Sequence, residues 1–320
     1  MRGNYTHFEV QALADGVWAA IHKDGGAAYS NAGIVDLGER ALLFDTFDMA
    51  IAARELRQAV VELTGRAPTW VVNSHEHGDH WGGNQVFADD AILLSTHAAR
   101  AGMLAWGQEI EESKSNLEQG EKNIRELEAK LEVETDPVRR KALERNLTRE
   151  RYYHADLPAF RFCPPVQTFD GTLTFHGSKR TVELVAVPPA HTPGDCYLAL
   201  PKEKILFTGD LAFFACPPFM ARNCDLPGWL EQLERFQGSK YKTFVPGHGP
   251  LGTKQDLARE QAYLVAMRDL VGTAIQDGKT LKDVLRLPMP APFADWAAFS
   301  GRQENNFRTL YAQLRQGKPG

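Results

Sequence analysis

The sequence predicts an α/β fold in which two β-sheets pack face to face with helices on the outside. First, a pattern of hairpin, aspartate, helix, strand and histidine occurs twice within the 320 residues. Second, a charged helical segment separates the two occurrences, and a largely helical region follows the second. Two such βα halves can share a core between their sheets. Their strand ends would then meet at one edge, where a shared site is expected.

The first occurrence begins with a hairpin at Gly33–Phe44, where short apolar runs flank a polar turn. Asp45 follows this hairpin directly. Residues 50–63 then place apolar side chains at helical spacing, and the apolar run Trp70–Val72 is typical of a buried strand. That strand leads the chain to His75.

The second occurrence repeats this order about 160 residues later in the chain. A hairpin at Cys196–Phe207 ends at Asp210, a helix follows at Trp229–Phe236, and the strand Thr243–Val245 leads to His248. If the repeat is real, this second aspartate and histidine lie at strand ends equivalent to those of the first pair. A chance likeness between two ordinary α/β stretches is the alternative interpretation.

Residues 108–155 are predicted to form a helical-hairpin insertion between the halves. Apolar residues recur at heptad spacing in its first part, and Asp136 followed by Pro137 is typical of a helix start. The insertion is also rich in Glu, Lys and Arg. Its charges fit a solvated surface, a lid over the site or a dimerisation arm, and the last would make a homo-oligomer. The heptad residues are Leu117, Ile124, Leu127 and Leu131.

Residues 253–320 are predicted to form a C-terminal helical region that packs on the same domain, so that 1–320 is a single domain. An apolar stripe at helical spacing opens this region, a proline-rich loop follows at Leu287–Pro292, and a last helix is expected near Glu304–Leu314. No residue in it is predicted to carry chemistry. The stripe consists of Leu257, Leu264, Met267 and Leu270.

Composition narrows the classes of partner. The formal net charge of −5 and the pI near 6.1 argue against a broad cationic face for nucleic acid. The start of the chain lacks a long apolar stretch and no later segment has membrane-spanning length, so no membrane partner and a cytoplasmic location are expected. The four cysteines are far apart and fit isolated, buried thiols; they are Cys163, Cys196, Cys216 and Cys224.

The segment directly after the first predicted strand carries the chemistry. His75, His77, Asp79 and His80 lie within six residues, among glycines that permit a tight backbone. Burying these groups side by side leaves polar atoms unsatisfied unless a cation or a dense hydrogen-bond network meets them. Imidazole and carboxylate are suitable ligands for zinc, iron and manganese. The remaining histidines are interpreted as packed or exposed residues: His7, His22, His97, His154 and His176.

This cluster resembles the His-x-His-x-Asp-His signature of the metallo-β-lactamase superfamily. Three downstream motifs are similar to the family's other ligand motifs: His191 in Pro-Ala-His-Thr-Pro-Gly-Asp, Asp210 in Phe-Thr-Gly-Asp-Leu, and His248 in Val-Pro-Gly-His-Gly. The resemblance runs from about Val17 to Pro250. It implies a four-layer αββα sandwich with a two-metal site at the sheet edge.

The resemblance also implies how the ligands are divided. His75, His77 and His191 would bind the first metal, Asp79, His80 and His248 the second, and Asp210 would bridge them. Two Zn²⁺ ions are expected, with iron or manganese as alternatives, because the donors are nitrogen and oxygen without thiolate.

Two divalent ions sharing a hydroxide could attack a small acyl substrate near neutral pH without a serine or cysteine nucleophile. Asp79 is then the candidate catalytic residue that orients this nucleophile and shuttles its proton. Asp45 is either a hydrogen-bond partner of a metal-binding imidazole or a strand-end turn residue.

The expected reaction is hydrolysis of an ester, lactone, lactam or thioester. Asp210 stands where many true β-lactamases of the superfamily have cysteine or serine, and the set more closely resembles the glyoxalase II, lactonase and esterase branches. Apolar residues near the ligands form either a pocket wall or plain core. The alternatives are a phosphodiesterase or nuclease of the same fold, a mononuclear iron oxidoreductase similar to persulfide dioxygenases, and a non-catalytic binding protein. The apolar residues are Trp81, Phe213, Phe214, Phe219 and Met220.

Overall fold

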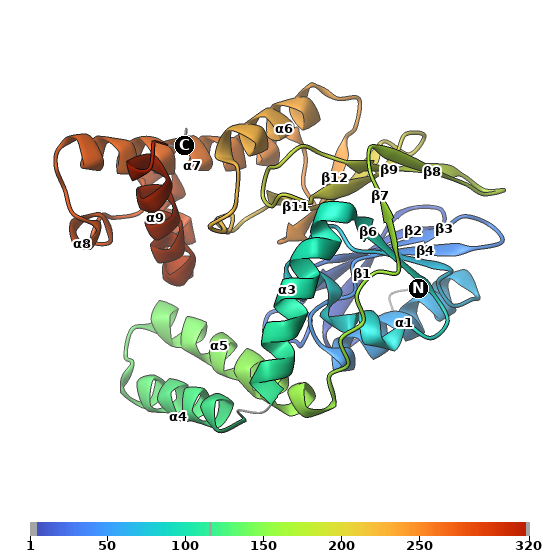
Figure 1. Cartoon of the computed structure of the whole chain (residues 1–320), viewed down its shortest axis with the longest axis horizontal. Coiled ribbons are helices and arrows are strands. Elements are labelled where there is room, and N and C mark those ends of the chain that lie inside the picture. The colour runs from blue at the N-terminus through green and yellow to red at the C-terminus, as the bar shows by residue number, and fades with distance from the viewer. Residues whose placement is uncertain (1–4, 115–116, 318–320) are drawn as a thin grey trace.

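The computed structural model describes residues 5–114 and 117–317 and contains two β-sheets that face each other (Figure 1). The first sheet has the strand order β1-β2-β3-β4-β5-β6-β7, so its strands follow one another along the chain. Its strands are β1 (Phe8–Ala14), β2 (Val17–His22), β3 (Ala32–Asp36), β4 (Ala41–Phe44), β5 (Trp70–Val72), β6 (Ile92–Thr96) and β7 (Gln167–Phe169).

The second sheet has the order β12-β11-β10-β9-β8. Its strands are β8 (Thr172–His176), β9 (Thr181–Ala186), β10 (Cys196–Leu200), β11 (Ile205–Phe213) and β12 (Thr243–His248). Sequence reasoning recognised the two hairpins and the strands that follow them. It did not assign β1, β6, β7, β8 or β9, because their short apolar runs lack the flanking signals that mark the others.

The predicted internal repeat is present in the strand pairing. In the first half β3 pairs antiparallel with β4, and β4 pairs parallel with β5 after helix α1 (Ala50–Thr64). In the second half β10 pairs antiparallel with β11, and β11 pairs parallel with β12 after helix α6 (Leu226–Gly238). One detail differs from the prediction: Asp210 does not end the hairpin, because β11 continues to Phe213 with a shifted register at Gly209.

Three groups of buried apolar residues define four layers. One group lies between the sheets and includes Phe44 and Val72 from the first sheet and Phe207 and Val245 from the second. A second group joins the first sheet to α1, and a third joins the second sheet to α6 and α7 (Lys254–Gln276). Each sheet therefore buries both faces, which gives the helix, sheet, sheet, helix order of the predicted αββα sandwich.

The insertion is larger than the predicted hairpin. A long helix, α3 (His97–Lys114), leaves the end of β6, and the hairpin itself consists of α4 (Leu117–Val133) and α5 (Pro137–Asp156). The Asp136 carboxylate accepts a hydrogen bond from the Arg139 amide, which confirms the predicted start of α5. The predicted insertion began at residue 108, inside α3, because the apolar residues at the start of that helix resemble those of an ordinary core helix.

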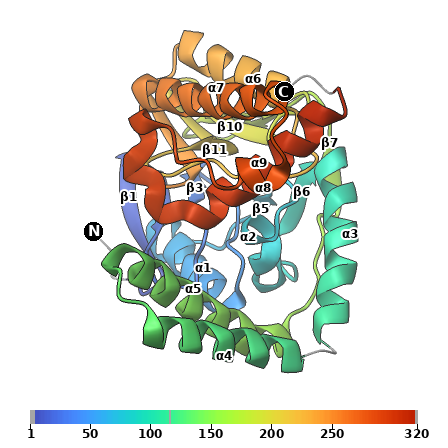
Figure 2. The same cartoon turned by 90° about the vertical axis from the view of Figure 1, so that its left-hand side faces the viewer.

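The C-terminal region is helical, as the sequence predicted. It comprises α7, the short helix α8 (Leu281–Val284), a 3₁₀ segment η3 (Ala291–Phe299) and α9 (Ser300–Arg315). Figure 2 shows the α4–α5 hairpin and α9 on the same side of the sandwich, and α5 contacts η3. That residues 1–320 form a single domain stays a prediction. Across the described ranges, no helix combines the length and apolar character that a membrane span requires.

Candidate metal centre

The loop after β5 is held by buried amide side chains. Asn73 donates hydrogen bonds to the His80 carbonyl (3.0 Å) and to the side-chain oxygen of Asn84 (3.0 Å), and Asn84 donates one in return (2.8 Å). The indole of Trp81 is buried and donates to the Glu76 carbonyl (2.7 Å). These bonds satisfy backbone groups that a loop of this shape cannot pair within a sheet. Trp81 is thus part of the support of this loop and not of a pocket wall.

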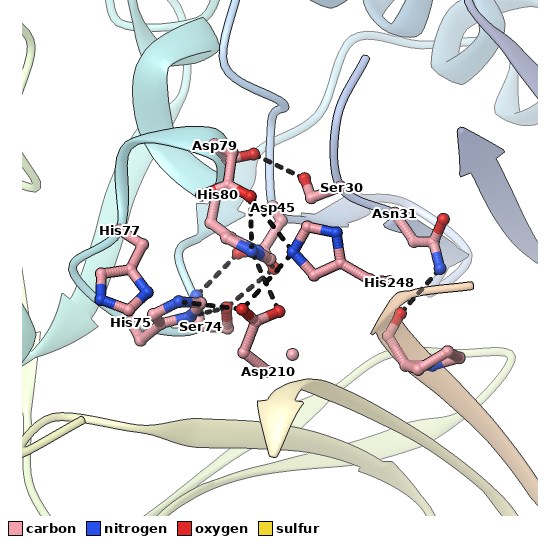
Figure 3. A network of polar contacts seen from close by, with 12 residues as sticks. Ser30, Asn31, Asp45, Ser74, His75, His77, Asp79, His80, Asp210 and His248 are labelled. Atoms are coloured by element: carbon pink, nitrogen blue, oxygen red, sulfur yellow. Dashed lines mark hydrogen bonds and ion pairs between the residues drawn. The ribbon is translucent and has the colours of Figure 1, made fainter. Parts of the chain in front are cut away.

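The first group of candidate ligands consists of His75, His77, His191 and Asp210, whose potential ligand atoms all lie within 4.8 Å of one another. His191 Nε2 is 3.0 Å from His77 Nδ1 and 3.3 Å from Asp210 Oδ2, and His75 Nε2 is 3.7 Å from the same oxygen. The side chains come from the segment after β5, the turn before β10 and strand β11, and Figure 3 shows His75 and His77 converging toward Asp210.

The second group consists of Asp79, His80 and His248. Asp79 Oδ2 lies 3.2 Å from His248 Nε2 and 3.6 Å from His80 Nε2. Asp210 faces this group as well, because its Oδ1 is 3.1 Å from His80 Nε2 and its Oδ2 is 3.5 Å from His248 Nε2. The structure therefore brings all seven residues together. Figure 3 shows the Asp210 carboxylate between His75 of the first group and His80 and His248 of the second.

The donor set fits divalent cations. His75 Nε2, His80 Nε2 and Asp210 Oδ1 are buried without a hydrogen-bond partner among the residues that the structure describes. Buried polar atoms of this kind are costly unless something binds them. Several inward-facing nitrogen and oxygen atoms lacking partners at one point are the arrangement that a metal ion satisfies. These residues are capable of holding metal, and their roles as ligands remain a proposal.

The charge states fit as well. Burial lowers the pKa of His75 and His191 well below the ordinary imidazole value, so both rings are neutral. Burial opposes ionisation of Asp210, yet the neighbouring His248 and His80 hold the pKa of this carboxyl well below its usual range. Neutral imidazole and ionised carboxylate are the forms that bind metal. For His80, nearby carboxylates outweigh burial and raise the pKa well above its ordinary value, which indicates that this site attracts positive charge.

Asp45 is hydrogen-bonded to a candidate ligand. Its Oδ2 lies 2.8 Å from His80 Nδ1 and accepts a hydrogen bond from Ser74 Oγ (2.8 Å), and its Oδ1 accepts one from the Ser74 amide (2.7 Å). Asp45 has a φ of +64°, a conformation that costs free energy for a non-glycine residue. These bonds hold the residue there and leave His80 Nε2 facing the site. Of the two interpretations of Asp45, the structure favours contact with the imidazole.

Three further features of the structure position the other candidate ligands. None of these three features was predicted from the sequence. The Asp195 carboxylate accepts bonds from the amide and hydroxyl of Thr192 (2.8 Å each), which fixes the turn that carries His191. Asn31 donates to the carbonyls of Pro246 and Gly249 (2.9 Å each) and so fixes both sides of His248. A Cβ on Gly247 would overlap the Asp210 carboxylate, so only glycine fits there.

A pocket with a cavity volume of about 900 Å³ opens onto the two ligand groups. Aromatic and aliphatic side chains form part of its wall, including Trp106 and Phe160 near the insertion and Phe219 after β11. Of the other apolar residues singled out from the sequence, Phe213, Phe214 and Met220 belong to the buried core. The pocket-wall interpretation thus holds for Phe219, and the core interpretation for the rest.

The pocket wall also contains polar residues that the sequence did not reveal. Arg145 and Arg149 come from α5, Arg302 and Asn305 come from α9, and Tyr29 comes from the loop before β3. Arg145 and Arg149 are four residues apart and share a helix face, but the charges of the insertion gave no reason to select them. The sequence predicted no chemistry in the C-terminal region, and this stays a prediction, but α9 of that region does line the pocket.

The remaining histidines are not among the seven candidate ligands. The His22 ring packs edge-on against His248 at 6.0 Å, and burial lowers the pKa of His22 to about 3. His22 belongs to neither ligand group, and His176 is exposed on β8. The cysteines are free thiols in the described chain, and burial raises the pKa of Cys216 and Cys224 to about 11, so these two are protonated near neutral pH.

A four-layer αββα fold with His and Asp side chains gathered at the sheet edge is typical of a class of metal-dependent proteins. The family comparison points to the same class. The family model described as the metallo-beta-lactamase superfamily matches residues 25–248, and the chain belongs to this superfamily. The chain is similar to the structure of a metallo-beta-lactamase from Pontibacter korlensis, with 20% identity and a TM-score of 0.55 over 80% of this chain and 98% of that one.

A metallo-beta-lactamase from Erythrobacter litoralis is also similar, with 14% identity and a TM-score of 0.57 over 83% of this chain and 100% of that one. At these identities the likeness shows the fold alone. The comparison with curated proteins yields no match. The matched family residues end at His248, so α7, α8, η3 and α9 lie beyond them.

Proposed function

We propose that this chain is a dinuclear metal-dependent hydrolase, most consistent with zinc, that cleaves an ester, lactone, lactam or thioester bond of a small acyl substrate. One observation carries the proposal: two groups of candidate ligands share the Asp210 carboxylate at one end of a cavity of about 900 Å³. The apolar side chains of that cavity suit an acyl substrate.

A pair of divalent cations lowers the pKa of water toward neutrality and stabilises negative charge that develops on a carbonyl or leaving group. The chain then has to position the reacting groups. Asp79 is suited to this task because one of its oxygens faces His248 and its side chain retains some exposure toward the pocket. Burial opposes its ionisation, but His80 and His248 hold the pKa of Asp79 well below its usual range. An ionised Asp79 can accept a hydrogen bond from the attacking water and orient it.

Ser30 contributes to the placement of Asp79. Its hydroxyl donates a hydrogen bond to the Asp79 carbonyl (2.5 Å), and the side chain of Ser30 is buried (Figure 3). The backbone of the ligand loop is thereby fixed from the loop before β3. The carboxylate is left to turn toward the cavity.

Small phosphodiesters are the second candidate substrates, because arginine side chains line the same cavity. Guanidinium groups bind phosphate oxygens well. A panel that contains lactones, lactams, thioesters, simple esters and phosphodiesters separates the two candidates, since the same preparation is assayed on each bond.

The proposal is tested by elemental analysis combined with that panel. We expect about two divalent ions per chain and turnover of an acyl substrate. Asp79→Ala should abolish turnover while circular dichroism and Tm stay close to those of the unmodified protein. His176→Ala, on the exposed face of β8, is the matched control and should keep metal and activity. A metal-free preparation with full activity, or a single iron with oxygen consumption, would refute the proposal.

A further inference from the structure

Two arginines from distant parts of the chain approach the candidate metal centre in the same way. Arg149 of α5 lies over the ring of Tyr29 at 3.6 Å, and Tyr29 packs edge-on against His248 at 5.4 Å. Arg302 of α9 lies over the ring of Phe213 at 5.5 Å, and Phe213 stacks on His248 at 5.0 Å with planes 7° apart. Each guanidinium is thus separated from the same candidate ligand by one aromatic ring.

Both guanidinium groups are fixed in place by the protein. Arg149 Nη2 contacts Asp48 Oδ2 at 3.5 Å, in addition to its stacking on Tyr29. Arg302 Nη1 donates to the Pro217 carbonyl (3.0 Å) and to Cys216 Sγ (3.5 Å). These contacts hold both guanidinium groups in place, and the Asp48 carboxylate offsets part of the charge of Arg149. A fixed cation of this kind loses little conformational entropy when it binds a ligand.

The acidic residues of the cavity have contacts within the protein, and one of them, Asp48, forms the ion pair with Arg149. Glu76 accepts a hydrogen bond from Asn223 (2.9 Å), and Asp156 accepts one from the Ala50 amide at the start of α1 (2.8 Å). Asp79 and Asp210 belong to the ligand groups. Four arginines, including Arg222, face five carboxylates in the lining of the cavity, so two divalent cations at the ligand groups would give it an excess of positive charge. We name Arg145, Arg149 and Arg302 the cationic wall.

We propose that the cationic wall binds an oxyanion of the substrate, a carboxylate or a phosphate that is remote from the bond to be cleaved. Guanidinium groups present planar pairs of N–H donors that match such oxygens. The apolar wall at Trp106 and Phe219 takes the body of the substrate. This inference rests on the proposed hydrolase function and narrows it to amphipathic acyl compounds with a separate negative charge.

The arrangement also gives the two helical additions a function. The insertion supplies Arg149 and the C-terminal region supplies Arg302, and α5 contacts η3 directly before α9. Figure 2 shows the two additions meeting on one side of the sandwich. Of the three interpretations of the insertion, these contacts favour the one that places it over the site, where it forms part of the cavity wall.

The experiment compares three acetate esters that share one scissile bond: phenyl acetate, 4-acetoxyphenylacetate and 4-acetoxyphenyl phosphate. With the metal-loaded protein we expect KM to be about tenfold lower for an anionic ester than for phenyl acetate, because charge-assisted hydrogen bonds form only with the former. The carboxylate and phosphate arms identify which oxyanion is preferred. Equal KM values for the three esters would overturn the proposal.

The variants locate the preference. Arg149→Gln should lower the ratio of the KM for phenyl acetate to the KM for an anionic ester toward one. Arg302→Lys keeps the charge but loses the planar donors, so it should lower this ratio in part. Arg139→Gln is the matched control, because Arg139 lies on the same helix α5 with an exposed side chain and does not line the cavity. An unchanged ratio in Arg149→Gln and Arg302→Lys would contradict the assignment.

A binding measurement separates this inference from the hydrolase proposal. Calorimetry compares 4-hydroxyphenylacetate with 4-ethylphenol, a neutral compound of similar shape that contains no bond for hydrolysis. Preferential binding of the carboxylate that is lost in Arg149→Gln supports the wall even if none of the esters is cleaved. Turnover of the esters with equal binding of the two phenols would leave the hydrolase intact and refute the wall.

Discussion

The candidate metal centre, named here the metal end, and the cationic wall are built in different ways. At the metal end, His75, His80 and His191 are fully buried, and strand ends and short turns fix them through backbone hydrogen bonds. At the cationic wall, Arg149 and Arg302 are half-buried and project from helices that pack on the outside of the sandwich. The sheet edge holds the candidate ligands themselves, whereas each arginine is separated from the candidate ligand His248 by an aromatic ring. We therefore expect changes at the metal end to affect metal content and kcat, and changes at the cationic wall to affect KM.

Asp210→Ala is expected to have the largest effect. Asp210 faces both ligand groups, and both of its oxygens lie within 3.7 Å of candidate ligand nitrogens. Its removal takes the shared carboxylate from both groups and leaves buried imidazoles facing one another. Elemental analysis should give below about one ion per chain, and turnover should fall to background. Retention of about two ions and full activity would show that Asp210 does not connect the groups.

Asp45→Asn should have a smaller effect at the same end. The amide keeps the shape of the side chain but weakens the contact with His80 Nδ1, which orients that ring. Metal affinity, measured by competition with a chelator, should fall by about 10- to 100-fold. Asp24→Asn, at an exposed turn before β3, is the control and should bind metal normally. Unaltered affinity in Asp45→Asn would reduce Asp45 to a turn residue.

The metal end was also the part that the sequence revealed. Four donors within six residues stand out in a single chain, and the strand before them is a continuous apolar run, so motif and element support each other. His191, Asp210 and His248 were found because each lies in a short motif with glycine or proline. All seven depend on local sequence, and local sequence is what such reasoning uses.

The cationic wall could not be predicted in the same way. Arg149 is one of many charges on α5, and nothing in its neighbours distinguishes it from Arg139, which is exposed. Its position over Tyr29 depends on how the insertion folds back across the first sheet, which is a long-range property. The same holds for Arg302, whose partners Pro217 and Cys216 are about 85 residues away in the chain. Function there arises from tertiary packing and not from a motif.

At the cationic wall, Asp48→Asn should change specificity in the opposite direction from Arg149→Gln. Burial raises the pKa of Asp48 to about 6, although the nearby Arg149 opposes this shift. At pH 8 the carboxylate is ionised and partly neutralises Arg149. Asp48→Asn should therefore lower KM for 4-acetoxyphenylacetate by about threefold at pH 8. The gain should shrink below pH 6, where the unmodified Asp48 is itself protonated, and a pH-independent gain would contradict this explanation.

Glu260 of α7 connects the metal end and the cationic wall, and its replacement should have the smallest effect. Its Oε2 accepts a hydrogen bond from the Phe213 amide (2.9 Å), Phe213 stacks on His248, and Oε1 is buried without a hydrogen-bond partner among the described residues. Burial raises the pKa of Glu260 well above its ordinary value, so the folded protein holds this proton more tightly than the unfolded chain does. The contribution of Glu260 to stability is therefore fully present below the unfolded pKa and falls as the pH rises toward the folded one.

Glu260→Gln keeps the acceptor for the Phe213 amide and removes the titration. The difference in Tm between the variant and the unmodified protein, both metal-loaded, should grow from pH 5 to pH 8 in favour of the variant. It should reach roughly 1–2 °C, which corresponds to about 1 kcal/mol in a chain of this size. Glu304→Gln, exposed on α9, should show no such trend. The metal end is fixed by its own hydrogen bonds, so kcat should change little in Glu260→Gln. A large loss of kcat would mean that Glu260 of α7 is needed to hold His248 in place.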